Sequence, residues 1–149
     1  MAQEFRLQVL LDLAQKRLDA ATVELQRLRV FWHEAQVKLD QLKTYETEYA
    51  GSLQTRMGQG IGVAQLNDYR LFLAKLARAI ETQGGEVERR QRAWEAEHAG
   101  WLTLKQRQQA LEVLAQRHAA ELIVKEGKRE QKQQDEFASK TGKNEASRR

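Results

Sequence analysis

The chain has 149 residues, no cysteine and no proline, and its formal net charge is +4 at pH 7. Without cysteine it can form neither a disulfide nor a thiolate metal site. It has no apolar run of about 18 residues that could cross a membrane, and its first thirteen residues lack the pattern of a secretory signal. The length favours one domain, and the abundance of Gln, Ala, Leu, Glu, Lys and Arg favours long helices.

The first third of the chain carries an apolar stripe with 4-3 spacing. Its thirteen members are Leu7, Leu11, Ala14, Leu18, Ala21, Leu25, Leu28, Trp32, Ala35, Leu39, Leu42, Glu46 and Tyr49, and only Glu46 is polar. A repeat that averages 3.5 residues keeps one edge of a helix against a partner over a long distance. The stripe predicts a helix over about residues 4–49, which is about 70 Å long.

Four glycines follow, at positions 51, 58, 60 and 62. Glycine is the least helix-favouring residue after proline, so we expect the turn over residues 51–62. A short connection between two long helices favours an antiparallel hairpin. The predicted fold is therefore all-α, with two long helices in an antiparallel coiled coil.

A second stripe with 3-4 spacing comes after this turn. Its seventeen members are Leu66, Tyr69, Leu73, Leu76, Ile80, Gln83, Val87, Arg90, Trp94, Glu97, Trp101, Leu104, Gln108, Leu111, Ala115, His118 and Leu122. Gly84 and Gly85 lie inside it and cost about 2 kcal/mol of helix propensity relative to alanine. Because the spacing resumes after them, we expect a soft point or kink and no break.

The two predicted helices differ in length, so the second is expected to overhang the first. Folding about the turn would bring Leu7 opposite Gln108 and leave the chain after about Leu111 unpaired. An unpaired apolar stripe in water usually marks an interface, although this end could also fray or pack on a second copy. The apolar residues of the overhang are Leu111, Leu114, Leu122, Ile123 and Val124.

The C-terminal residues are rich in Lys, Arg, Ser, Gly and Asn. We expect residues 1–138 to form the hairpin and residues 139–149 to form a disordered basic tail. This basic end is either a solvated tail or an electrostatic contact for an acidic partner.

No enzyme site is predicted. His33, His98 and His118 lie far apart in the sequence without the spacing of a zinc site, and His118 falls on the apolar stripe as a polar core residue. The glycines of residues 51–62 lack the Lys-Ser/Thr pair of a phosphate-binding loop. We therefore expect no catalytic residue, no metal, no cofactor and no small-molecule substrate.

Nucleic-acid binding is a weaker alternative. Arg89, Arg90 and Arg92 form a cluster, but four glutamates between residues 86 and 97 dilute its charge. Surfaces that follow phosphates usually carry a purer positive face, so no nucleic-acid partner is expected.

Two aromatic residues flank the stripes beside the turn. In an antiparallel pair, the heptad positions of Tyr45 and Phe72 lie on the same edge, next to Leu42 and Leu76. Charged residues usually occupy such positions. The two rings are therefore either additional core or part of a binding patch.

Taken in order, these features resemble the flagellar export protein FliJ family, a small component of the type III export apparatus. The resemblance covers most of the chain. The residues that carry it are the stripe from Leu7 to Ala14, Tyr45 with Tyr49, Gly60-Ile61, Tyr69, Phe72, Leu76, Ala79-Ile80, Trp101 with Lys105, and the segment from Glu130 to Ala138 that contains Asp135-Glu136-Phe137.

This resemblance implies a non-enzymatic stalk similar to the rotor stalk of F- and V-type ATPases. In the family, the end with both termini binds and stimulates the hexameric export ATPase, and a patch near the turn binds the export-gate membrane protein. Export chaperones are further partners. The implied gate-binding residues are Leu42, Tyr45, Tyr49, Phe72, Leu76 and Ala79.

The overhang coincides with the implied ATPase-binding end. The expected ATPase-binding residues are Leu7, Leu11, Leu111, Leu114, Leu122, Ile123 and Val124. The implied location is the cytoplasmic face of the inner membrane at the flagellar base. The alternative from another class is a structural coiled-coil adaptor that self-associates through the overhang.

Overall fold

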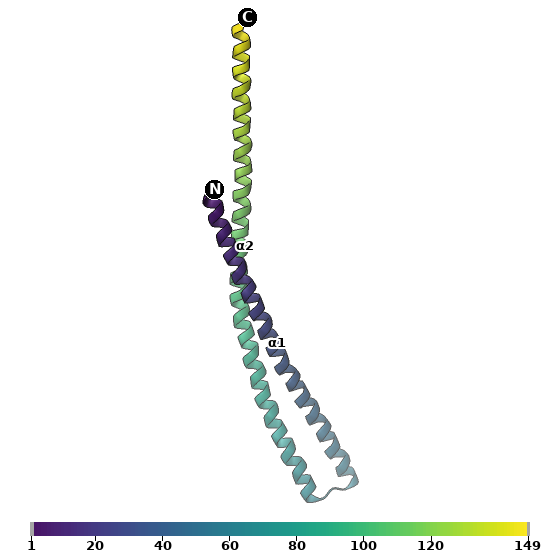
Figure 1. Cartoon of the computed structure of the whole chain (residues 1–149). Helices are drawn as coiled ribbons and strands as arrows, with labels where there is room; N and C mark the ends of the chain where they lie inside the picture. Colours follow the sequence, from purple (N-terminus) through teal and green to yellow (C-terminus); the bar gives the residue numbers. More distant parts are fainter. Residues whose placement is uncertain (1, 149) are drawn as a thin grey trace. The chain divides into compact units, whose positions relative to one another are not determined.

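The computed structural model describes residues 2–148 and contains two helices, α1 (Ala2–Gln59) and α2 (Val63–Arg148) (Figure 1). They pack against each other, and no strand occurs in the described part of the chain, which confirms the all-α prediction. The chain divides into two units. The turn unit is Asp19–Thr103, and the terminal unit joins the described parts of Met1–Leu18 and Leu104–Arg149.

The connection between the helices is only Gly60, Ile61 and Gly62, which is shorter than the predicted turn over residues 51–62. Gly60 has a φ of +96°, a conformation that glycine adopts without steric cost. The carbonyl of Gly62 accepts a hydrogen bond of 2.9 Å from the amide of Leu66, which opens α2. Gly51 and Gly58 lie inside α1. The helix tolerates them, since an exposed glycine lowers helix stability by only about 1 kcal/mol relative to alanine.

The two predicted stripes form the interface between the helices. We call their thirty positions the seam, and each of them is buried or half-buried. The tightest packing lies in the turn unit, where Ala35, Leu39 and Val87 are buried and Trp32 and Ile80 pack against them. The heptad spacing therefore predicted the packed face of both helices.

Polar seam residues of α2 bind the backbone of α1. Gln83 Nε2 donates to the carbonyl of Ala35 at 3.0 Å, and Arg90 Nη1 donates to the carbonyl of Phe31 at 2.8 Å. Ala35 is 1% exposed, and its small side chain allows this close approach. Residue numbers rise on α2 as those of their α1 partners fall, which confirms antiparallel pairing within the turn unit.

Gly84 and Gly85 lie inside α2, which continues without a break as predicted. A Cβ atom added to either glycine would meet nothing within 4 Å. The double change of Gly84 and Gly85 to alanine is therefore expected to stabilise the protein by about 2 kcal/mol. Thermal unfolding followed by circular dichroism should show a melting temperature about 4–8 °C higher. An unchanged or lower value would contradict open space at these positions.

The terminal unit pairs in a different register from the predicted one. Leu7 and Gln8 line a groove together with Ala115 and His118, whereas the sequence placed Leu7 opposite Gln108. The turn is centred on Ile61, whereas the predicted turn over residues 51–62 is centred closer to the N-terminus. This displacement moves the partner of each α1 residue towards the C-terminus of α2. Glu4 still lines a groove with Arg129, so the overhang begins later than Leu111.

From Ile123 to Ser147 every residue is exposed, and α2 continues to Arg148. The structure thus shows a helix where the sequence suggested a disordered tail over residues 139–149, of which Arg149 lies outside the described residues. Lys, Gln, Glu and Ala between Lys125 and Lys140 favour a helix, and no proline interrupts it. Neither helix has, in its described residues, an apolar stretch long enough to span a membrane.

Candidate binding surfaces

Four aromatic rings gather beside the turn, and we call them the turn-end cluster: Tyr45 and Tyr49 of α1 and Tyr69 and Phe72 of α2. The ring centres of Tyr45 and Phe72 are 5.8 Å apart in an edge-on arrangement, and those of Tyr49 and Phe72 are 4.4 Å apart. Tyr49 also lies 4.7 Å from Tyr69. The predicted contact between Tyr45 and Phe72 across the seam is therefore present.

The turn-end cluster has a buried side and an open side. Tyr69 is 8% exposed, and its hydroxyl lies 3.5 Å from Oγ of Ser52. The guanidinium of Arg56 lies 5.6 Å from the Tyr69 ring centre. Tyr45, in contrast, is 48% exposed. The half-buried rings of Tyr49 and Phe72 thus hold the accessible Tyr45 in place, an arrangement suited to a preformed contact surface.

The other residues of the predicted gate patch differ in exposure. Leu76 is 6% exposed, so it supports the surface from beneath and offers little contact area itself. Leu42 is half-buried and Ala79 is exposed. Tyr69 also belongs to the turn-end cluster, although its seam position predicts a core residue and no binding role.

The predicted ATPase-binding residues also fall into two groups. Four lie half-buried on the seam, and these are Leu7, Leu11, Leu111 and Leu122. Three are open to solvent: Leu114 is 49%, Ile123 73% and Val124 57% exposed. Leu122 and Ile123 line a groove with Glu4 and the cations of Lys125 and Arg129. Glu126 also lines this groove, so an apolar floor lies between walls that carry two acidic and two basic side chains.

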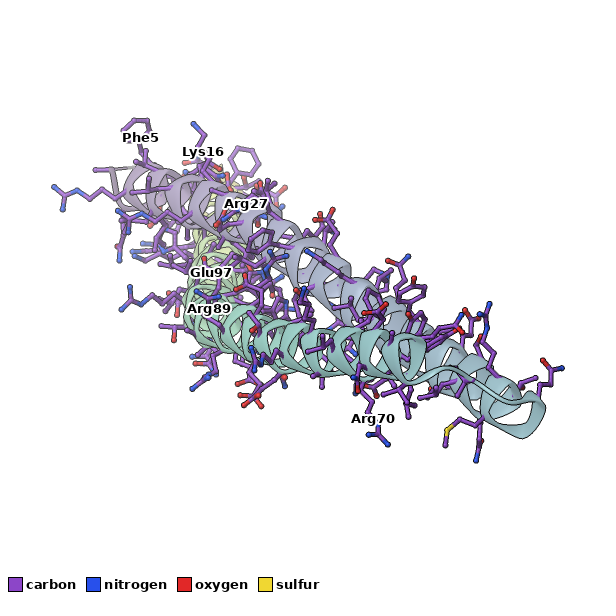
Figure 2. All side chains as sticks on the ribbon, turned by 90° about the horizontal axis from the view of Figure 1, so that it is seen from below. Phe5, Lys16, Arg27, Arg70, Arg89 and Glu97 are labelled. Atoms are coloured by element: carbon purple, nitrogen blue, oxygen red, sulfur yellow. The ribbon has the colours of Figure 1, made fainter. Side chains whose placement is uncertain are left out.

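Two phenylalanines of the terminal unit were missing from the predicted sites. Phe5 is 72% and Phe137 73% exposed, and Figure 2 shows the Phe5 ring pointing away from the helix. Both lie off the seam. An apolar aromatic residue outside the seam was the feature of the sequence that could have identified both phenylalanines as candidate contact residues.

The turn unit holds a second aromatic group, whose three tryptophans the heptad spacing predicts only as separate seam residues. The ring centres of Trp32 and Trp94 lie 5.7 Å apart, and His98 stacks on Trp94 at 4.9 Å and on Trp101 at 5.9 Å. The guanidinium of Arg29 lies 4.8 Å from the Trp32 ring centre. Trp101 Nε1 donates to the Thr22 hydroxyl at 2.8 Å. These half-buried rings join α1 to α2.

His118 lies half-buried on the seam, as predicted, and its buried Nε2 has no hydrogen-bond partner. Within residues 2–148 no group of side chains is arranged to hold a metal ion.

A buried polar atom without a partner costs about 1–3 kcal/mol. His118→Leu is therefore expected to stabilise the protein by at least about 1 kcal/mol, measured by urea unfolding. A loss of stability would instead show that the imidazole has a partner in solution.

Comparisons with known proteins identify the family of this chain. The model of the family described as "Flagellar FliJ protein" matches residues 3–147. The Flagellar FliJ protein of Salmonella typhi is 34% identical over 140 residues, which cover 94% of this chain and 95% of the relative. The protein of the same name from Escherichia coli K12 is 29% identical with the same coverage. No solved structure gives a significant match. The chain therefore belongs to the flagellar FliJ family.

Proposed function

We propose that this protein is a non-enzymatic stalk of the flagellar type III export apparatus. It binds and stimulates the hexameric export ATPase and links it to the export-gate membrane protein. Membership of the flagellar FliJ family supports a role in the flagellum. The observation that carries the finer proposal is that α2 contributes to two separate candidate surfaces, one around Phe72 in the turn unit and one around Val124 in the terminal unit.

The turn-end cluster is the proposed contact for the export gate. Tyr45 is half exposed beside the Phe72 ring, and the buried Tyr69 and Leu76 fix their surroundings. Aromatic residues held on a rigid base are typical hot spots of protein interfaces, because they lose little conformational freedom on binding. Leu42, Tyr49 and Ala79 complete the proposed surface.

The terminal unit is the proposed contact for the ATPase. Ile123 and Val124 are exposed on α2, and every residue beyond them as far as Ser147 is exposed as well. An exposed helix that extends beyond the residues facing α1 can enter a narrow opening in a partner. Lys125 and Arg129 beside Leu122 would form ion pairs with acidic residues of the partner, and Glu4 and Glu126 of the same groove would pair with basic ones.

The proposed role requires no cofactor and no substrate of its own, and it places the protein at the cytoplasmic face of the inner membrane. Export chaperones are proposed as further partners.

The stimulation is tested by measuring ATP hydrolysis by the purified export ATPase with increasing amounts of this protein, alongside the protein alone. The proposal expects a saturable increase in the ATPase rate and no hydrolysis by the protein alone. An ATPase rate that stays constant would contradict it.

A further inference from the structure

One face of α1 in the turn unit is apolar although it points away from α2. Val23 is 68%, Val30 56% and Val37 39% exposed, and they follow one another at intervals of seven residues. Seven residues are nearly two helical turns, so the three side chains lie in one row along α1. Phe31, which is 40% exposed, lies beside this row.

This row occupies the heptad position farthest from the seam. Such positions are normally polar, because they remain in water when the two helices pair. Lys16 and Thr44, which occupy the same heptad position in the neighbouring repeats of α1, follow that rule. Three valines at successive repeats of the same position therefore form a second apolar stripe, separate from the seam.

Two opposite charges alternate with the valines. The outward stripe reads Val23, Arg27, Val30, Glu34 and Val37, with the same 4-3 spacing as the seam. The structure shows a shallow groove along it, lined by Val23, Arg27, Val30, Phe31 and Glu34 together with Gln26. A helix with a matching stripe would fit along this face.

The charges indicate which helix that is. Arg27 and Glu34 stand at nearly equal distances on either side of the pair Val30-Phe31. If two copies of α1 lie antiparallel across this centre, each Arg27 faces Glu34 of the other copy, and both ion pairs form. If they lie parallel, Arg27 faces Arg27 and Glu34 faces Glu34, which is repulsive.

We propose that the outward stripe is a self-association surface, through which two copies of this protein pair antiparallel about a two-fold axis near Val30. Such an isologous interface uses the same patch on both copies. It lies outside the turn-end cluster and outside the terminal unit. It therefore goes beyond the proposed function.

Arg27 has hydrogen-bonding capacity for this contact. Its Nε and Nη2 donate to Glu24 at 2.9 and 2.7 Å, and its side chain remains 61% exposed. The bond from Arg27 lowers the pKa of Glu24 below its usual value. A guanidinium has five N–H groups, so three can still reach a carboxylate of the other copy.

The stripe is short, and the association is expected to be weak. From Val23 to Val37 it spans about 21 Å, and stable dimers usually bury about 1,600 Å². We expect a dissociation constant on the order of 100 µM. Sedimentation at rising concentration should move the apparent mass from 17.2 kDa towards twice that value. A constant 17.2 kDa would leave the stripe to a different protein and overturn the proposal.

Single cysteines test the geometry, because the chain has none of its own. Val30→Cys lies near the two-fold axis and should give a covalent dimer with a short bis-maleimide. Val23→Cys should not, because antiparallel pairing places its two copies about 22 Å apart. Arg78→Cys, exposed on α2, sets the background. Cross-linking of Val30→Cys at background level, or equal cross-linking of Val23→Cys and Val30→Cys, would overturn the antiparallel pairing.

A charge exchange tests the pairing independently of cross-linking. Arg27→Glu should weaken self-association at least about fivefold, because the new carboxylate would face Glu34 of the other copy. Adding Glu34→Arg should restore it, because the exchanged charges again attract each other. Arg78→Glu is the matched control for the change in net charge, and circular dichroism checks that all variants remain helical. A double variant that associates no better than Arg27→Glu alone would contradict the proposed ion pairs.

Discussion

Replacing Tyr45 and Phe72 together with alanine is expected to weaken binding to the cytoplasmic domain of the export gate by at least about 30-fold. The estimate follows from the loss of about 2 kcal/mol or more when the central aromatic residues of an interface are truncated. The centres of the two rings are 5.8 Å apart, and Tyr45 is 48% exposed. Biolayer interferometry with the purified gate domain measures the change in affinity.

The helical content of the double variant should stay nearly unchanged, because Tyr69 and Leu76 retain the buried side of the seam. Phe5→Ala combined with Phe137→Ala is the matched control, since it removes two exposed rings from the terminal unit. This control should keep its affinity for the gate. If the Tyr45 and Phe72 variant unfolds, the rings belong to the core, and a folded variant with full affinity would remove them from the gate surface.

Leu122→Asp combined with Val124→Asp is expected to reduce stimulation of the export ATPase at least about tenfold while gate binding is retained. Burying an uncompensated carboxylate at an apolar contact costs several kcal/mol, so the loss of a factor of ten is a lower bound. Leu122 also lines a groove with Glu4, and a carboxylate there would add repulsion. The measurement is the ATPase rate at saturating protein, with gate affinity measured in parallel.

The matched control carries the same added charge elsewhere on α2. Ala99→Asp combined with Leu102→Asp changes two exposed positions of the turn unit outside both proposed surfaces. It should stimulate the ATPase as the unchanged protein does. Full stimulation by the Leu122 and Val124 variant would exclude these residues from the mechanism. Equal loss in the control would show a general effect of charge.

Much of the fold was predictable because a coiled coil repeats one rule along its length. Even polar members of the stripes, such as Glu46, Gln83 and Arg90, lie half-buried where the spacing placed them. The sequence could not show how they are accommodated. Gln83 and Arg90 bind carbonyls of α1, which depends on how closely the small Ala35 lets the helices approach.

The turn and the register were less predictable. Helix propensity alone could not decide which of the four glycines reverses the chain, because the reversal depends on the positive φ of Gly60. An error of a few residues in the predicted turn centre doubles in the predicted pairing. This is why Gln108 was the predicted partner of Leu7, whereas Leu7 lies by Ala115 and His118. The length of α2 was also underestimated, since composition does not separate an exposed helix from a disordered tail.

The candidate surfaces were predictable only in part. The contact of Tyr45 with Phe72 followed from the heptad frame, whereas the burial of Leu76 required the structure. The outward valines at 23, 30 and 37 were visible in the sequence, but their meaning depends on which face of α1 packs against α2. Their exposure in the structure shows that these valines lie on the face of α1 that does not pack against α2.

The proposed function requires one molecule of this protein to hold the export ATPase and the export gate at the same time. The direct measurement is retention of purified ATPase on immobilised gate domain, with and without this protein. We predict that the ATPase is retained only when the protein is present, and that the variants of the turn-end cluster and of Leu122 with Val124 each abolish retention. Competition, in which bound ATPase displaces the protein from the gate, would contradict the account.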